Sequence, residues 1–431
     1  MHKEKATQTV CVVGLGKIGL TLAAVYANNG FNVIGADVND KVVSTVNQGQ
    51  SHVANEPGLD ELVLRAFENK RLRATLNTKE AVSKSTIVVV IVPVLVDEQN
   101  DVDYSYIDSA VEEIAKGVKK NTTIIFETTL PPGDTKNRFG KRIEDMSGLK
   151  AGNDFYLAYS PERVYSNHIL SGLEKYPKVV GGLNEKSLQI ASAFYKKALQ
   201  CEVIEVDSTD TAEFSKVAEC VYRDVNIALA NELAKFADEK GVKLSDVIKA
   251  SNSQPYSHIH SPGIGVGGHC IPIYPYFFMN RGLKEGLTHF SREVNDGMAE
   301  YAISKIENQV GALETKNILI LGLSYRGNVK EATKSTTWLL TEQLKKKNAN
   351  VFVHDPMFTE EEIKSFSMEP LSLGDPRIST LDIVILQAFH SEYQDLRFED
   401  FTNCKLIFDG RNEFNKEDIT RAGITYEGLG G

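Results

Sequence analysis

The sequence predicts an α/β protein with two doubly wound parallel sheets joined by a long central helix. Short β-branched runs alternate with helical stretches near both ends of the chain, a long helical stretch separates them, and a glycine follows the first strand of each series. A chain of 431 residues has room for two or three domains with sizeable cores. We expect the first α/β domain in residues 1–206, a central helical region in 207–300 and the second α/β domain in 311–431.

The strands of the first sheet are expected in short runs rich in β-branched residues. These runs are Thr9–Val13, Asn32–Asp37, Thr86–Val92, Thr122–Glu127, Phe155–Ala158 and Glu202–Val206. From Thr209 to about Gly241 the chain shows no strand-like run and carries apolar side chains at helical spacing, which predicts one long helix.

A stretch rich in Gly and Pro, Ser261–Tyr276, follows the predicted helix. It is too broken for regular structure, and we expect it to be a functional loop. Strand-like runs then resume and predict the second sheet. These runs are Asn317–Leu321, Asn350–His354, Leu381–Leu386 and Lys405–Phe408.

Composition argues against several classes of protein. A formal net charge of −10 argues against nucleic-acid binding. No run reaches the roughly 18 apolar residues of a membrane helix, and Met1–Gln8 lacks the apolar core of a signal peptide. We therefore expect a cytoplasmic protein without membrane contact. The cysteines form no C-x-x-C pair and lie near no histidine cluster, so neither disulfides nor a metal site is expected.

A G-x-G-x-x-G motif follows the first predicted strand and precedes an apolar helical stretch. Its first glycine permits a tight turn, its second lets backbone amides approach a pyrophosphate, and its third allows close packing of helix and strand. An aspartate ends the next strand, where it accepts ribose hydroxyls and repels a 2′-phosphate. In this context the motif predicts a Rossmann-like NAD site, and the alternative is that the glycines serve only a turn. The expected cofactor-binding residues here are Gly14, Gly16, Lys17, Ile18, Gly19 and Asp37.

Cys270 is the candidate nucleophile. It ends the glycine-rich run Pro262–Cys270, where few side chains block access to the thiol. A thiolate captures an aldehyde as a thiohemiacetal, which loses hydride to give a thioester that water opens. The alternative is an inert, small, apolar side chain. The neighbouring His269 either lowers the pKa of the thiol or packs against it.

Two further groups of residues suggest chemistry. Lys216, Cys220 and Arg223 share one face of the predicted long helix, and their basic members suit an oxyanion or an anionic substrate. The alternative is a solvated helix face. Glu162 follows a strand and is a candidate base for a hydrolytic water, the alternative being a surface ion pair with Arg163.

Taken together, these motifs resemble the UDP-glucose/GDP-mannose dehydrogenase family over nearly the whole chain. They occur in the family's order: the glycine motif, Val92-Pro93, Glu127-Thr128-Thr129, Ser160-Pro161-Glu162-Arg163, the Lys216 helix, and Gly267-Gly268-His269-Cys270. The resemblance implies an enzyme that oxidises a sugar CH2OH to a carboxylate in two NAD-dependent hydride transfers. It also implies homodimers or larger assemblies formed through the long helix.

The resemblance implies roles for individual residues. Cys270 carries the thioester, and Lys216 stabilises an oxyanion. Glu162 works with the hydrolytic water, and Thr129 lies beside the nicotinamide, with Val92 and Pro93 also at the cofactor. The expected substrate-binding residues are Glu162, Arg163, Val164, Lys216, Cys220, Arg223, Asn226, Tyr256, Gly263, Gly267, Tyr274 and Arg326.

Residues 222–233 are similar to the family branch that acts on N-acetylated sugars. The resemblance therefore implies a UDP-N-acetylhexosamine substrate, and we expect UDP-N-acetylmannosamine. Some positions depart from the family pattern, because Cys220 stands where an Asn is usual and Tyr274 where an Asp is usual. The other replacements are Tyr256 and Thr333 for arginines, Arg326 for a lysine, and Val94-Leu95 for the Thr-Pro of a Val-Pro-Thr-Pro signature.

These departures leave two alternatives open. One is an enzyme that retains its NAD, such as an epimerase, in which hydride leaves and returns and no water attacks. The other is a catalytically silent binding or assembly subunit that keeps the fold.

Overall fold

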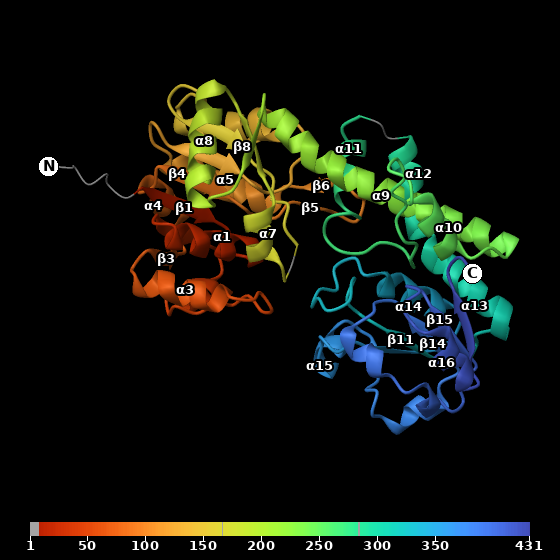
Figure 1. Cartoon of the computed structure of the whole chain (residues 1–431). Helices are drawn as coiled ribbons and strands as arrows, with labels where there is room; N and C mark the ends of the chain where they lie inside the picture. The colour runs from red at the N-terminus through yellow and green to blue at the C-terminus, as the bar shows by residue number, and fades with distance from the viewer. Residues whose placement is uncertain (1–7, 166, 283–284) are drawn as a thin grey trace. The chain divides into compact units, whose positions relative to one another are not determined.

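The computed structural model describes residues 8–165, 167–282 and 285–431, and the chain separates into two units. The first unit comprises Met1–Glu219 and Tyr276–Arg281, and the second comprises Cys220–Pro275 and Gly282–Gly431. Each unit contains one large sheet, and a long helix runs from the first unit into the second (Figure 1). The predicted fold class is therefore confirmed.

The sheet of the first unit has eight strands in the order β10-β9-β8-β7-β4-β1-β2-β3. They are β1 (Thr9–Val13), β2 (Asn32–Ala36), β3 (Leu72–Thr75), β4 (Ile87–Val90), β7 (Thr123–Phe126), β8 (Tyr156–Tyr159), β9 (Lys178–Gly182) and β10 (Val203–Val206). The strands from β3 to β8 are parallel, as expected, but β9 pairs antiparallel with β8. A separate hairpin pairs β5 (Leu95–Val96) with β6 (Val102–Asp103).

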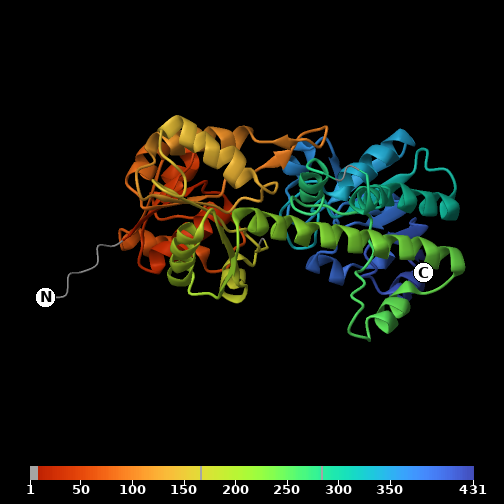
Figure 2. The same cartoon turned by 90° about the horizontal axis from the view of Figure 1, so that it is seen from above.

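Helices cover both faces of this sheet (Figures 1 and 2). They are α1 (Lys17–Asn28), α2 (Asp40–Val46), α3 (Leu59–Glu68), α4 (Thr78–Ser83), α5 (Ser105–Gly117), the π-helix η1 (Thr135–Gly140), α6 (Lys141–Ser147), α7 (Ile169–Lys175) and α8 (Glu185–Ala198). Val10 and Val12 of β1 belong to the same buried core as Leu20 of α1 and Phe194 of α8. The intervening Cys11 points to the opposite face, because side chains alternate along a strand.

Helix α9 (Thr209–Lys240) is 32 residues long and matches the long helix expected from the sequence. The Ser208 hydroxyl accepts a hydrogen bond from the Thr211 N–H at 3.1 Å and caps its first turn. Gly241, with a φ of 64°, ends it in the left-handed conformation that favours glycine. Local sequence signals therefore define both ends of the helix.

The sheet of the second unit has six strands in the order β13-β12-β11-β14-β15-β16, all parallel. They are β11 (Asn317–Leu321), β12 (Asn350–His354), β13 (Glu369–Pro370), β14 (Ile383–Leu386), β15 (Leu406–Asp409) and β16 (Thr425–Gly428). The order places β11 in the interior of the sheet, as β1 is in the first unit.

The remaining helices are α10 (Leu244–Ser251), α11 (Tyr274–Met279), α12 (Leu287–Asp296), α13 (Met298–Val310), α14 (Thr336–Lys346), η2 (Pro376–Thr380), η3 (Ser391–Asp395), η4 (Phe398–Asp400), α15 (Glu360–Ser365) and α16 (Lys416–Arg421). The Gly- and Pro-rich stretch is irregular as expected, except that α11 includes its last residues.

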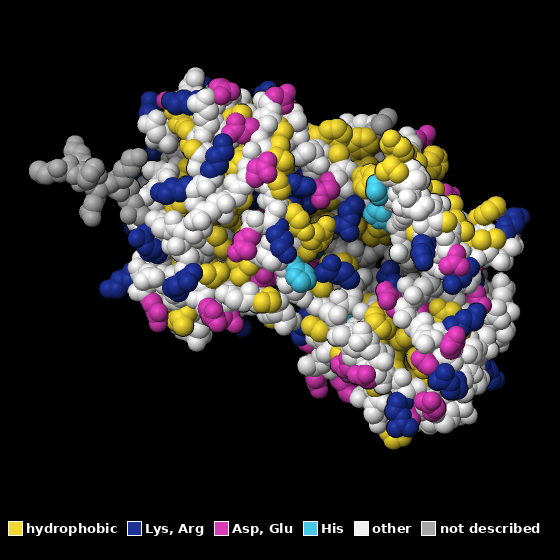
Figure 3. All heavy atoms as spheres, in the orientation of Figure 1, with side chains coloured by type: hydrophobic (Ala, Val, Ile, Leu, Met, Phe, Trp, Pro, Cys, Tyr) yellow, Lys and Arg dark blue, Asp and Glu magenta, His cyan; other side chains and the backbone are white. Residues whose placement is uncertain are grey.

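Acidic and basic side chains are interspersed on the face of each unit that Figure 3 shows. Among the helices of the described ranges, none combines the length and the apolar character that crossing a bilayer requires.

Candidate active site

The expected cofactor residues and the catalytic candidates Thr129 and Glu162 lie along one edge of the sheet of the first unit. They follow the carboxyl ends of neighbouring parallel strands: the glycine motif follows β1, Asp37 follows β2, Val92 and Pro93 follow β4, Thr129 follows β7, and Glu162 follows β8. Ligand sites of open α/β sheets form at this edge. Strand order therefore gathers residues that are far apart in the sequence.

The glycine motif forms a tight turn with an open helix N-terminus. Gly14 has a φ of 93°, and its N–H donates to the Ala36 carbonyl oxygen at 2.8 Å. A Cβ at Gly19 would overlap the Gly14 carbonyl oxygen, whereas nothing lies within 4 Å of the Cβ position of Gly16. Helix α1 begins at Lys17 without a side-chain cap, so its first amides, including those of Lys17 and Ile18, are available to a phosphate.

Asp37 closes this turn. Its Oδ2 accepts the Leu15 N–H at 2.7 Å, and its Oδ1 accepts the Asn39 N–H at 2.9 Å. The carboxylate is partly exposed, and each oxygen keeps a lone pair for a ribose hydroxyl. The residues present therefore fit NAD, with phosphates at α1 and a ribose at Asp37.

Two threonines follow β7. The Thr128 hydroxyl donates to the Val92 carbonyl oxygen at 2.7 Å and so joins the ends of β7 and β4. Thr129 is the next residue and is buried, with 6% of its surface exposed. Because Thr129 directly follows Thr128, this hydrogen bond holds Thr129, the residue expected beside the nicotinamide, near Val92 and Pro93.

Glu162 belongs to a buried charge cluster with Glu127 and Lys178. Lys178 Nζ lies 2.6 Å from Glu127 Oε2 and 3.0 Å from Glu162 Oε2. The hydroxyls of Tyr195 and Tyr26 donate to Glu127 Oε1 at 2.6 and 3.2 Å. The surface ion pair of Glu162 with Arg163, the alternative left open by the sequence, is therefore wrong.

The backbone also holds Glu162. Its Oε1 accepts the N–H groups of Arg163 and Val164 at 2.6 and 3.0 Å. Burial acts to raise the pKa of Glu162, but the Lys178 ammonium and these two amides outweigh it and lower the pKa below its ordinary value. For Glu127 burial dominates and raises the pKa. One lone pair of Glu162 Oε2 remains for another donor.

Lys216 is buried on α9, with 8% of its surface exposed. Its ammonium has no ion-pair or hydrogen-bond partner among the described residues. One helical turn further on, Glu219 Oε2 accepts from Arg163 Nε at 3.1 Å, which links α9 to the segment after β8. The solvated-face alternative is therefore wrong for Lys216.

In the second unit, Cys270 lies in a loop held by its own backbone and by the segment after β11. Its carbonyl oxygen accepts hydrogen bonds from the N–H groups of Ile273 and Tyr274 at 3.2 and 2.9 Å. These two bonds form the turn that leads into α11. His269 Nδ1 is 2.7 Å from Glu331 Oε1. Cys270 is partly exposed, whereas Cys11, Cys220 and Cys404 are buried.

The other expected substrate-binding residues of the second unit lie on α9, on or near the glycine-rich loop, and after β11. They are Cys220, Arg223, Asn226, Tyr256, Gly263, Gly267, Tyr274 and Arg326. Cys220 is 4% exposed, whereas Tyr256 is 92% exposed. The Asn226 side chain donates to the Tyr222 carbonyl oxygen at 2.7 Å, and the Gly263 N–H donates to Asn231 Oδ1 at 2.9 Å.

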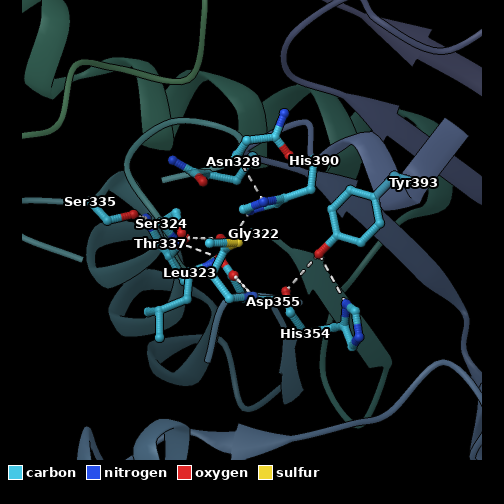
Figure 4. A network of polar contacts seen from close by, with 12 residues as sticks. Gly322, Leu323, Ser324, Asn328, Ser335, Thr337, His354, Asp355, His390 and Tyr393 are labelled. Atoms are coloured by element: carbon cyan, nitrogen blue, oxygen red, sulfur yellow. Dashed lines mark hydrogen bonds and ion pairs between the residues drawn. The ribbon is translucent and has the colours of Figure 1, made fainter. Parts of the chain in front are cut away.

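The second unit repeats the glycine turn of the first. The Gly322 N–H donates to the His354 carbonyl oxygen at 2.7 Å, and the Leu323 and Ser324 N–H groups donate to Asp355 Oδ2 at 2.8 and 2.7 Å (Figure 4). Asp355 directly follows β12, as Asp37 follows β2. Both sheets thus begin with the same strand, glycine turn and acid.

Asp355 differs from Asp37 in its surroundings. It is buried, and His390 Nε2 lies 3.1 Å from its Oδ2 (Figure 4). Because the Asn328 N–H donates to His390 Nδ1 at 3.0 Å, the imidazole proton lies on Nε2 and points to Asp355. Asp355 therefore orders the segment Gly322–Asn328, which carries Arg326. Of the two acids, Asp355 is buried and Asp37 is partly exposed.

These features define a two-unit α/β protein with a dinucleotide site in the first unit. Comparison with family models narrows this class. The model "UDP-glucose/GDP-mannose dehydrogenase family, NAD binding domain" matches residues 8–199, the central-domain model matches 210–296, and the UDP-binding-domain model matches 319–416.

Similar proteins cover almost the whole chain. The UDP-N-acetyl-D-mannosamine dehydrogenase of Methanococcus maripaludis is 35% identical over 439 residues, which cover 100% of this chain and 98% of the relative. The NDP-N-acetyl-D-galactosaminuronic acid dehydrogenase of Ralstonia solanacearum is 32% identical, covering 96% and 97%. The solved structure of UDP-D-ManNAc dehydrogenase from Pyrococcus horikoshii has a TM-score of 0.88 at 29% identity, covering 98% and 99%.

The chain belongs to the UDP-glucose/GDP-mannose dehydrogenase family. It is an NAD-dependent UDP-sugar dehydrogenase, with an N-terminal NAD-binding domain and a C-terminal UDP-binding domain. The recognition made from the sequence motifs is thereby confirmed.

Sequence reasoning missed several residues of these sites. Lys178 opens β9, which was not predicted because Lys-Val-Val-Gly-Gly ends in two glycines. Asp355 carried a usable signal, since it follows a predicted strand as Asp37 does. Glu331 and His390 gave none, because each reaches its partner only through folding.

Proposed function

We propose that the enzyme oxidises C6 of a UDP-N-acetylhexosamine, UDP-N-acetylmannosamine in the first instance, to a carboxylate. The observation that carries this proposal is the full-length similarity to proteins named UDP-N-acetyl-D-mannosamine dehydrogenases. The partly exposed Cys270 in its glycine-rich loop supports the second oxidation, because it supplies the nucleophile that an aldehyde needs. Bound NAD would accept one hydride in each of the two oxidations.

The overall reaction consumes one sugar CH2OH, two NAD⁺ and one water, and yields a carboxylate, two NADH and three protons. In the proposed sequence, the alcohol first becomes an aldehyde. The Cys270 thiolate then adds to the aldehyde carbon, and loss of hydride from that carbon leaves a thioester. Water attacks the thioester carbonyl, the C–S bond breaks, and the thiolate leaves.

Lys216 is proposed to stabilise the oxygen on which negative charge develops at C6. Its ammonium is buried and has no acidic partner in the described part of the chain, so its charge is available to an oxyanion. A buried ammonium that need not leave an acidic partner stabilises this charge as it develops, and Lys216 is therefore expected to act mainly on turnover.

Glu162 is proposed to orient the hydrolytic water. Its lowered pKa keeps it ionised at neutral pH, and Lys178 with two amides fixes its position. The remaining lone pair of Oε2 can accept one proton of a water, which directs that water's oxygen toward an acyl carbon. Thr129 is proposed to border the nicotinamide.

The remaining expected residues are proposed to bind the UDP-sugar. The diphosphate requires cations and backbone amides, and the exposed or partly exposed arginines suit this role. The proposed set is Arg163, Val164, Cys220, Arg223, Asn226, Tyr256, Gly263, Gly267, Tyr274 and Arg326.

We also propose that the enzyme is a homodimer formed through α9. Phe214, Tyr222, Leu229 and Phe236 are 45–60% exposed and recur every seven or eight residues, so they form one apolar stripe along the helix. A second copy of the stripe is its self-complementary partner. Light scattering should give a dimer mass for the wild type and a monomer mass for Leu229→Glu/Phe236→Glu, whereas an unchanged mass would exclude this interface.

The substrate assignment is tested by following NADH at 340 nm with a panel of sugar nucleotides. The panel contains UDP-ManNAc, UDP-GlcNAc, UDP-GalNAc, UDP-glucose and GDP-mannose, each at matched concentration. We expect the highest kcat/KM for UDP-ManNAc. A higher value for UDP-GalNAc would instead match the Ralstonia relative, and a higher value for UDP-glucose would exclude the N-acetyl assignment.

The replacements at Cys220 and Tyr274 favour one competing function, an NAD-retaining reaction that needs no water. Such an enzyme would convert a UDP-sugar without net NADH. Chromatography of the sugar nucleotide alongside the NADH assay separates the two functions.

A further inference from the structure

The Cys270 loop is fastened to the segment that follows β11. Gly268, with a φ of 95°, donates its N–H to the Thr333 carbonyl oxygen at 2.9 Å. A Cβ at Gly267 would come within 2.7 Å of Tyr325 Cβ and 2.9 Å of the Lys334 carbonyl oxygen, so a larger residue would separate the two segments. The loop therefore has a fixed register with the segment that carries Glu331.

His269 connects that segment to the thiol. Its Nδ1 is 2.7 Å from Glu331 Oε1, and its imidazole also hydrogen-bonds the Cys270 side chain. Because Glu331 occupies Nδ1, Nε2 is the nitrogen left for the sulfur. Glu331 is 12% exposed and His269 46% exposed, so the carboxylate is shielded while the imidazole and thiol remain within reach of solvent.

We propose that His269 and Glu331 hold Cys270 as a thiolate, with His269 taking the thiol proton and Glu331 acting as the positioning residue for the imidazole. The Sγ–H bond breaks, Nε2 gains the proton, and the Nδ1–H is donated to Glu331, so no oxidant or reductant is involved. This inference rests on the proposed function, because it gives the nucleophile of that reaction its reactive state.

The electrostatics of the cluster agree with this arrangement. The hydrogen bond with Cys270, followed by that with Glu331, raises the pKa of His269 to about 10. An imidazole of this kind is a cation at neutral pH, and a neighbouring cation favours the thiolate.

Other charged and titratable groups face the same cluster. Tyr325 is close enough to Cys270 for the two to interact electrostatically, and Arg326, Glu331 and Arg223 also act on Tyr325. Lys330, by contrast, pairs with Glu362 at 2.7 Å. A variant of His269 leaves Tyr325 and both arginines in place, so it isolates the effect of the imidazole on the thiol.

The expected effect follows from the thiolate fraction. An ordinary thiol, with a pKa of about 8.5, is only a few per cent ionised at pH 7. Complete ionisation at pH 7 raises the thiolate fraction about 30-fold, whereas the lower nucleophilicity of so acidic a thiol costs about 10-fold, so the rate at pH 7 is expected to be about two- to three-fold higher. The shape of the pH profile is therefore the more sensitive measure of the thiolate.

The test is alkylation of the complete enzyme by iodoacetamide, without NAD or sugar nucleotide, from pH 5.5 to 9.5. Mass spectrometry of peptides follows Cys270 and, as an internal reference in the same sample, the partly exposed Cys201. The variants are His269→Gln and Glu331→Gln. The matched control is His289→Gln, because His289 is 42% exposed and also faces a glutamate, Glu293, at 3.4 Å.

We expect the wild-type rate at Cys270 to be nearly constant between pH 7 and 9. His269→Gln should lower the rate at pH 7 about two- to three-fold and, as the main effect, replace the flat profile by a rise toward pH 9. Glu331→Gln should cause a smaller loss, and His289→Gln none. An unchanged Cys270 profile in both His269→Gln and Glu331→Gln would overturn the proposal. Because the assay contains no substrate, failure of UDP-ManNAc to react would refute the proposed function and leave this result standing.

Discussion

Replacing Lys178 by Met tests whether the buried charge cluster stabilises the first unit. Lys178 is 6% exposed, Glu127 0% and Glu162 11%, so the substitution leaves two carboxylates without their shared cation in a nearly dry site. Removing one partner of a buried ion pair costs about 3–5 kcal/mol. We expect a loss of about that size, because the hydroxyls of Tyr195 and Tyr26 still bind Glu127 but carry no charge.

Urea unfolding monitored by circular dichroism measures this loss. The single tryptophan, Trp338, lies on α14 in the second unit, so its fluorescence transition is an internal reference that should not move. The control is Lys196→Met, which breaks an exposed pair with Glu205 at 3.0 Å and should cost less than about 1 kcal/mol. A Lys178→Met midpoint equal to that of Lys196→Met would refute the reasoning.

The same variant has a pH signature. Burial already raises the pKa of Glu127, and loss of Lys178 removes the main opposing influence, so the pKa rises further. A carboxyl whose pKa is raised on folding stabilises the folded state at low pH, and this stability is lost as the pH rises through the folded pKa. The deficit of Lys178→Met should therefore be smallest near about pH 5 and grow toward about pH 8. A deficit that shrinks with rising pH would contradict the assignment.

Three predictions concern the proposed chemistry. Asp37→Ala should reduce the ratio of NADP to NAD dissociation constants at least about 10-fold, because the lost charged hydrogen bond to the ribose is worth roughly 1.5–3 kcal/mol. Cofactor titrations measure this ratio, and the control Asp40→Ala, at an exposed position, should leave it unchanged. Lys216→Ala should lower kcat about 10²–10³-fold with little change in KM, whereas Lys240→Ala on the same helix should match the wild type. Cys270→Ser should form no carboxylate product, whereas the control Cys201→Ser should form it. If hydrolysis is slow, a thioester on Cys270 of the wild-type enzyme should be detected by intact-protein mass spectrometry.

Most interior strands were predictable from the sequence, except β9, whereas of the four edge strands of the two large sheets only β10 was predicted. β1, β11 and β12 have the predicted bounds, because apolar β-branched runs are required where both faces are buried. β3 and β13, at sheet edges, contain an arginine and a proline respectively, and neither was predicted. Edge strands are covered less completely, so their sequences are less constrained.

The site was predictable where local sequence defines geometry. The glycine motif and Asp37 form the expected turn, since a backbone turn depends on neighbouring residues. The surroundings of Glu162 were not predictable, because Lys178 is 16 residues away and reaches it through the antiparallel pairing of β8 and β9. Glu331 is likewise 62 residues from His269, beyond the range of any local pattern.

The most direct test of the central claim is the number of NADH molecules formed per UDP-ManNAc consumed. Purified enzyme is incubated with limiting UDP-ManNAc and excess NAD, NADH is measured by absorbance, and the sugar nucleotide is quantified by chromatography. Oxidation through a Cys270 thioester predicts two NADH for each UDP-N-acetylmannosaminuronate in the wild type, and no acid in Cys270→Ser. Consumption of UDP-ManNAc without net NADH, or two NADH per acid from Cys270→Ser at the wild-type rate, would contradict it.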